Sequence, residues 1–131
     1  MARILLVDDD VHFRTMLRIT CERAGFEVIE AEDGDAALES FRSANPDLVV
    51  TDIVMPGKQG LELIADLRRE CPHSRIIAMS GGGHANPYSY LSMAKGSGVD
   101  AVFVKPLNRE DFLAKVRELT GEAELSHEGA P

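Results

Sequence analysis

Residues 4–10 form the run Ile4-Leu5-Leu6-Val7-Asp8-Asp9-Asp10, in which four β-prone apolar residues lead without a break into three acids. A short continuous apolar run predicts a strand that is covered on both faces, and such strands are typical of parallel sheets. The acids that follow at once mark the carboxyl end of this strand. The run therefore predicts the first strand of an α/β domain.

The chain continues as an alternation of strand and helix patterns. The second strand pattern alternates apolar and acidic residues, and the helix patterns place apolar residues at helical spacing between glycine and proline stops. Expected strands cover residues 4–7, 26–31, 48–50, 76–79 and 101–104; expected helices cover residues 11–24, 36–41, 61–71 and 88–95, and a last helix follows Pro106.

This order predicts one doubly wound (βα)5 domain, a three-layer sandwich with a parallel five-stranded sheet. The domain fills residues 1–120, and residues 121–131 have no apolar period, which is typical of a terminal tail or a linker stub.

Charge and composition exclude several classes of protein. The 131 residues include 14 Lys and Arg against 22 Asp and Glu, a net charge of −8 that disfavours nucleic acid and anionic membrane surfaces as partners. The first residues lack the order of a signal peptide, so we expect a cytoplasmic protein. Cys21 and Cys71 stand 50 residues apart with no CxxC spacing, which gives redox chemistry or a cysteine metal site little support.

Polar side chains follow four of the expected strands. Asp8, Asp9, Asp52, Ser80 and Lys105 stand at these positions. Each could by itself be a helix cap or a solvated surface residue, and Asp10 is most simply a cap. Parallel strands, however, bring their carboxyl ends to one edge, where two carboxylates about 4 Å apart repel by roughly 4 kcal/mol at an effective dielectric of 20. An all-oxygen acidic cluster with one nearby lysine suits Mg²⁺.

These motifs together resemble the receiver domain of bacterial two-component response regulators. The acidic run of residues 4–10 is similar to the first strand and acidic pair of the family, and Asp52-Ile53-Val54-Met55-Pro56 with Gly60 is similar to its phosphoacceptor segment. Ser80 and Lys105-Pro106 complete the set. The resemblance covers almost the whole chain and implies a flavodoxin/CheY-like sheet of strand order 2-1-3-4-5.

The resemblance also implies a role for each of these residues. Asp52 would accept a phosphoryl group from a sensor histidine kinase or a histidine phosphotransfer protein. Mg²⁺ would be held by Asp9, Asp52 and the backbone carbonyl of Val54, with Asp8 acting through water. Lys105 would supply a second positive charge beside that of Mg²⁺, and the peptide bond from Lys105 to Pro106 would be cis. Ser80 would donate a hydrogen bond to the phosphoryl group.

By the same resemblance, the protein would catalyse only its own phosphorylation and dephosphorylation and would be no enzyme in the ordinary sense. We expect a stand-alone receiver, a monomer or weak dimer, that changes its binding surface for a downstream protein target, with no nucleic acid or membrane partner.

Two alternatives stay open. Many receivers carry Tyr or Phe three residues before the lysine, where this chain has Val102, and Phe103 would point to the opposite face of the strand. A receiver-like interaction module that binds its partner without phosphorylation is therefore the second hypothesis. The third is a magnesium-dependent hydrolase with an aspartyl nucleophile, whose DxDxT pattern is missing because Ile53 and Val54 follow Asp52.

Overall fold

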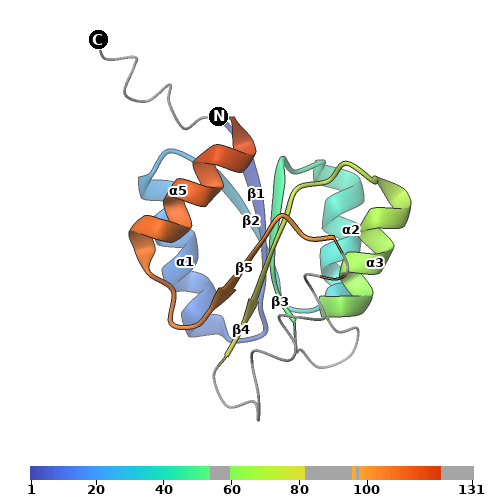
Figure 1. Ribbon diagram of the computed structural model, residues 1–131, viewed down its shortest axis with the longest axis horizontal. Helices are drawn as coiled ribbons and strands as arrows, with labels where there is room; N and C mark the ends of the chain where they lie inside the picture. Colours follow the sequence, from blue (N-terminus) through green and yellow to red (C-terminus); the bar gives the residue numbers. More distant parts are fainter. Residues whose placement is uncertain (54–59, 82–95, 97, 122–131) are drawn as a thin grey trace.

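The computed structural model describes residues 1–53, 60–81, 96 and 98–121, and these residues form one parallel sheet with helices on both faces (Figure 1). The five strands pair in parallel in the order β2-β1-β3-β4-β5, which confirms the expected fold. The strands are β1 (Arg3–Val7), β2 (Glu27–Ala31), β3 (Leu48–Asp52), β4 (Ile76–Ser80) and β5 (Ala101–Val104); the helices of the described residues are α1 (Val11–Arg23), α2 (Gly34–Ala44), α3 (Gly60–Glu70) and α5 (Arg109–Thr120).

The expected helix at residues 88–95 lies outside the described residues, as do Val54, most of the loop that follows it, and the second and third residues of the run Gly81-Gly82-Gly83. The expected boundary at residue 120, where α5 ends, stays a prediction.

Two hydrophobic layers enclose the sheet. Helices α1 and α5 cover one face and α2 and α3 cover the other, as Figure 1 shows. All five residues of β3 and of β4 are buried, because these central strands are covered on both faces. Within β5, Val102 packs toward the α2 and α3 side, whereas Phe103 packs on the other face against Phe112 of α5, with ring centroids 5.8 Å apart. The expected opposite orientation of these two residues is confirmed.

The chain turns sharply from β1 into α1 through Asp10. Its carboxylate accepts hydrogen bonds from the backbone N–H groups of His12 and Phe13, at 3.0 and 3.2 Å. Asp10 is therefore the N-terminal cap of α1, as expected, and it turns its side chain to the helix and not to the neighbouring acids.

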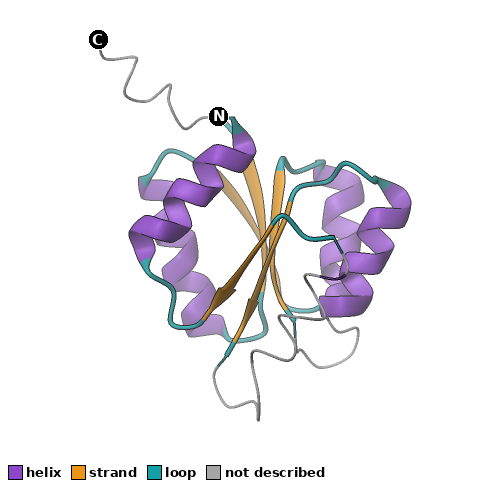
Figure 2. Ribbon diagram, in the orientation of Figure 1, coloured by secondary structure: helices purple, strands orange, loops and turns teal. Residues whose placement is uncertain are grey.

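The strands all run toward one edge of the sheet, the lower edge in Figure 2, where the arrowheads of β4 and β5 point. The register pairs Val7 with Thr51, Asp52 with Met79, and Ser80 with Val104, so the strands end almost level with one another. Residues just beyond these ends consequently meet at one place. No helix among the described residues has the length and apolar character needed to cross a bilayer.

Candidate functional site

The carboxyl edge of the sheet brings together the five side chains that the sequence singled out. Asp8 and Asp9 follow β1, Asp52 and Ser80 are the last residues of β3 and β4, and Lys105 follows β5. A backbone hydrogen bond from the N–H of Lys105 to the carbonyl of Ser80, at 2.8 Å, ties the last two together. The site is thus built from four strands that are far apart along the chain.

Three carboxylates form the acidic part of the site. One oxygen of each of Asp8, Asp9 and Asp52 lies within 4.8 Å of the others. Asp8 and Asp52 are only 1% and 4% exposed, whereas Asp9 is exposed. The cluster therefore has two buried members and one that faces solvent, which leaves it open to an ion or a ligand from one side.

Lys105 is the cation within this cluster. Its Nζ lies 2.7 Å from Oδ2 of Asp8 and 3.6 Å from Oδ2 of Asp52, and 4.3 Å from the centroid of the Phe13 ring. The ring of Phe13 covers the ammonium group, an arrangement that favours the cation electrostatically and shields it from water. The Lys105–Pro106 peptide bond is cis, as the resemblance led us to expect.

The two buried carboxylates differ in how their oxygens are used. Asp8 accepts a hydrogen bond at Oδ1 from the backbone N–H of Asp10, at 2.9 Å, and at Oδ2 from Lys105, at 2.7 Å. Asp52 accepts one at Oδ1 from the backbone N–H of Ile53, at 2.9 Å, while its Oδ2 lies 3.6 Å from the Nζ of Lys105, the nearest cation among the described residues. Both oxygens of Asp8 are engaged, and Oδ2 of Asp52 is the freer atom.

The environment of Asp52 disfavours its charge. Burial, the largest cause, raises the pKa of Asp52 from 3.8 to about 6; the nearby Lys105 acts in the opposite direction, and Asp8 and Asp9 raise the pKa further. Asp52 is thus ionised at neutral pH at a cost in free energy. An added cation in the cluster would offset that cost.

Ser80 is fully buried at the same edge. Its Oγ is among the few buried side-chain polar atoms of the described residues that make no hydrogen bond. Buried hydroxyl groups nearly always have a partner, because leaving one unpaired costs about 1–3 kcal/mol. The hydroxyl group is consistent with a site whose acceptor arrives from outside.

Two glycines let the backbone close in around these side chains. A Cβ on Gly60, the first residue of α3, would lie 2.1 Å from the backbone oxygen of Asp52 and 2.6 Å from the Cα of Ile53. Gly81 has φ of +150° and approaches Lys105, where a Cβ would lie 3.0 Å from the Cβ of the lysine. Glycine is required at both places, for space at Gly60 and for conformation as well at Gly81.

Two residues that support the site were not expected from the sequence. Phe13 covers Lys105, and Arg14 donates a hydrogen bond from Nη1 to the backbone carbonyl of Asp8, at 2.6 Å, while its Nε pairs with Glu30 of β2 at 2.7 Å. Both stand on the first turn of α1, where a residue's helical position alone does not reveal what it contacts. Only the packing of α1 against the sheet identifies them.

The donor set fits a magnesium ion. Among the described residues, the cluster has three carboxylates and no histidine or thiolate, which makes a hard-oxygen site, and its negative charge exceeds what Lys105 can balance. Within this cluster, Asp8 already accepts hydrogen bonds at both oxygens, whereas Asp9 is exposed and Oδ2 of Asp52 lies 3.6 Å from the Nζ of Lys105. Val54, whose carbonyl the sequence predicted as a further ligand, lies outside the described residues.

Comparison with known proteins gives a consistent result. Residues 4–117 match the family model described as the response regulator receiver domain. The chain is 33% identical over 117 residues to the chemotaxis protein CheY of Bacillus subtilis, which covers 88% of this chain and 95% of that protein. It is 39% identical to part of the CAI-1 autoinducer sensor kinase/phosphatase CqsS of Vibrio cholerae, covering 87% of this chain and 17% of the kinase.

Among solved structures, the response regulator TrrA of Thermotoga maritima, in complex with Mg²⁺ and BeF, is 34% identical, with a TM-score of 0.80 over 91% of this chain and 99% of that one. The chain spans about half or less of the first curated relatives that it matches, from 17% to 47% of their length.

Proposed function

The chain belongs to the response regulator receiver domain family of two-component signalling, and from this premise we propose that it is a phosphorylation-dependent switch whose phosphoryl group resides on Asp52. The observation that carries this proposal is the grouping of Asp8, Asp9 and Asp52 within 4.8 Å of one another, with the Nζ of Lys105 paired to Asp8 and Asp52. Asp52 is the member of this group that is buried and also has an oxygen without a close partner.

The proposed step is a phosphoryl transfer. Oδ2 of Asp52 attacks the phosphorus of a phosphohistidine on the donor protein, an O–P bond forms, the N–P bond breaks, and the imidazole that leaves takes up a proton. The product is an acyl phosphate. Because a loose phosphoryl transition state has little covalent demand, the protein contributes mainly position and charge.

Each residue of the site has a part in that step. Lys105 balances charge on the phosphoryl oxygens, and Ser80, whose Oγ is buried and unpaired, donates a hydrogen bond to one of them. Asp9 and Asp52, with the backbone carbonyl of Val54, are the proposed metal ligands, and Asp8 contributes through water. When bound, Mg²⁺ would supply positive charge that neutralises the phosphoryl oxygens and the acids around them.

We propose that the phosphodonor is a sensor histidine kinase or a histidine phosphotransfer protein. The phosphorylated receiver would then bind a downstream protein target. Next to the site, Phe13, Met16, Pro106 and Leu107 line a mostly apolar groove of about 440 Å³ that also reaches Lys105. An apolar surface of this kind beside the acceptor is where a protein that delivers the phosphoryl group would dock.

The remaining expectations belong to the same proposal. A receiver of this kind catalyses only its own phosphorylation and hydrolysis of its acyl phosphate, and a kinase as donor implies a cytoplasmic setting. We propose that the receiver acts as a stand-alone protein, and this is supported by the likeness to CheY, of which the chain spans 95%. We propose no nucleic acid or membrane partner, in keeping with the net charge of −8, and a monomer or weak dimer.

The test is intact-mass measurement of the protein after incubation with phosphoramidate and Mg²⁺. We expect one added phosphate on the wild type, none on Asp52→Asn, and none on the wild type in EDTA. Asp35→Asn, which changes an exposed acid in the first turn of α2, is the matched control and should accept phosphate normally. Absence of phosphate with Mg²⁺ binding demonstrated would instead favour the interaction module that works without phosphorylation.

A further inference from the structure

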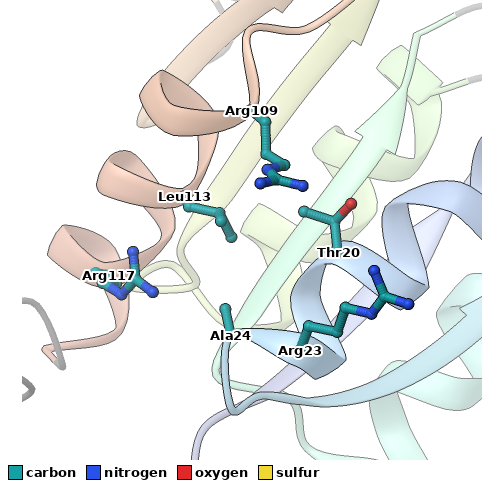
Figure 3. A pocket seen from close by; sticks show the side chains of 6 residues that line it. All are labelled: Thr20, Arg23, Ala24, Arg109, Leu113 and Arg117. Atoms are coloured by element: carbon teal, nitrogen blue, oxygen red, sulfur yellow. The ribbon is translucent and has the colours of Figure 1, made fainter.

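A pocket of about 310 Å³ lies between α1 and α5, and among the residues that the structure describes its charged lining is entirely basic. None of the residues around it belongs to the acidic site described above. The pocket is lined by Thr20, Arg23 and Ala24 from the end of α1, and by Arg109, Leu113 and Arg117 from α5 (Figure 3).

Helical spacing explains why α5 presents a single basic stripe to the pocket. Arg109, Leu113 and Arg117 follow one another at intervals of four residues and so lie on one face of the helix. Figure 3 shows Arg109 extending from the start of α5 toward Thr20 of α1. Leu113 forms a small apolar wall between the two arginines of this helix.

The three arginines of the pocket also differ from the other arginines of the protein. The chain has ten arginines, all within the described residues. Seven of them form ion pairs with Asp or Glu, namely Arg3, Arg14, Arg18, Arg42, Arg68, Arg69 and Arg75. Within the residues that the structure describes, three arginines form no ion pair, and all three line this pocket: Arg23, Arg109 and Arg117.

A shortage of acids does not explain this pattern, because the chain has 22 acidic against 14 basic residues. Three arginines that line one pocket give it a positive potential, which attracts any anion that enters. Their planar forks pair with phosphate through two parallel hydrogen bonds, and the Thr20 hydroxyl group is a further donor. The pocket has the composition of an anion site.

The size and charge of the pocket indicate which anion. Its volume lies at the lower end of the range of small-molecule sites, about 300 to 1,000 Å³. Balancing three positive charges there takes three carboxylates but only two phosphates, since each phosphate carries about −1.5 to −2. We propose that this pocket binds a small organic molecule that carries two or more phosphate groups, with Leu113 and Ala24 against its carbon skeleton.

The experiment is a titration of the ¹⁵N-labelled full chain with pyrophosphate in EDTA, followed by amide chemical shifts. We expect saturable shifts at Thr20, Ala24 and Leu113, affinity for pyrophosphate at least about tenfold above that for inorganic phosphate, and weakening by added salt. The double variant Arg109→Gln/Arg117→Gln should lose at least about tenfold in affinity. Arg69→Gln, an exposed arginine on α3, is the matched control and should bind as the wild type.

Several results would overturn the proposal: shifts confined to Asp52, Ser80 and Lys105, shifts that do not saturate, or equal losses in the double variant and the control. The spectra report at the same time whether each variant is folded. The proposal does not depend on phosphorylation of Asp52, so either can fail without the other.

Discussion

Replacing Asp52 by Asn removes a negative charge that the metal-free fold holds at a cost, so Asp52→Asn should make the protein more stable. Burial raises the pKa of Asp52 from 3.8 to about 6. Each pKa unit corresponds to 1.36 kcal/mol, so the shift of about two units corresponds to roughly 3 kcal/mol at neutral pH. Allowing for solvent screening and for altered hydrogen bonds in the variant, we expect a gain of about 2 kcal/mol in the free energy of unfolding.

The pH dependence gives this prediction its sign. The pKa of Asp52 is higher in the folded than in the unfolded protein, so the folded state binds the proton more tightly. The contribution of Asp52 to the free energy of unfolding therefore falls as the pH rises from about 4 to about 6, and it stays low above that range. The stability difference between Asp52→Asn and the wild type should be small near pH 4 and should reach its full size by about pH 7.

Urea unfolding in EDTA at pH 4, 5, 6, 7 and 8 measures this difference. Asp35→Asn, an exposed acid, should stay within about 0.5 kcal/mol of the wild type at each pH. Saturating Mg²⁺ should stabilise the wild type and narrow the gap, because a ligand that binds only the folded state stabilises it by mass action. An Asp52→Asn variant no more stable than the wild type at pH 7, or a stability difference that is constant with pH, would show that the charge of Asp52 does not destabilise the fold.

Three further substitutions test individual contacts of the site. Gly60→Ala should lower the free energy of unfolding by about 2–4 kcal/mol in urea, because its Cβ would lie 2.1 Å from the backbone oxygen of Asp52. Ser80→Ala should raise the free energy of unfolding by about 1 kcal/mol, because it removes a buried hydroxyl group that makes no hydrogen bond, and it should slow phosphorylation by phosphoramidate; a loss of stability would contradict this. Lys105→Ala should cost about 3 kcal/mol in EDTA, since it leaves buried Asp8 without its partner at 2.7 Å; unchanged stability would show that the pair contributes nothing.

Much of the fold could be predicted because its signals are local. The run Ile4–Val7 is apolar on both faces, and it lies inside β1, while the expected strand at residues 101–104 coincides with β5. The grouping of the site followed from one rule of parallel sheets, which brings the carboxyl ends of all strands to one edge. Asp10 as a helix cap is equally local, and the structure confirms it.

What the sequence could not provide depends on contacts between distant residues. That Lys105 lies closer to Asp8 than to Asp52, at 2.7 against 3.6 Å, is a matter of side-chain packing under the Phe13 ring. The raised pKa of Asp52 arises from burial, which cannot be read from the amino-acid composition or from the spacing of residues along the chain.

The basic pocket also depends on contacts between residues that are distant in the sequence. Arg23 and Arg117 are far apart in sequence, and their lack of ion pairs is a property of the folded surface. An arginine that lacks a partner cannot be recognised in the sequence, because the excess of acids in the chain suggests that every arginine has one.

The most direct test of the account is to identify the side chain that carries the phosphoryl group. The protein is incubated with phosphoramidate and Mg²⁺, treated with borohydride, which reduces an acyl phosphate to an alcohol, and digested for peptide mass spectrometry. We expect one reduced aspartate, at position 52, that is absent without Mg²⁺. Reduction at Asp8 or Asp9, or phosphate found on a serine or histidine with position 52 intact, would contradict the central claim that Asp52 is the acceptor.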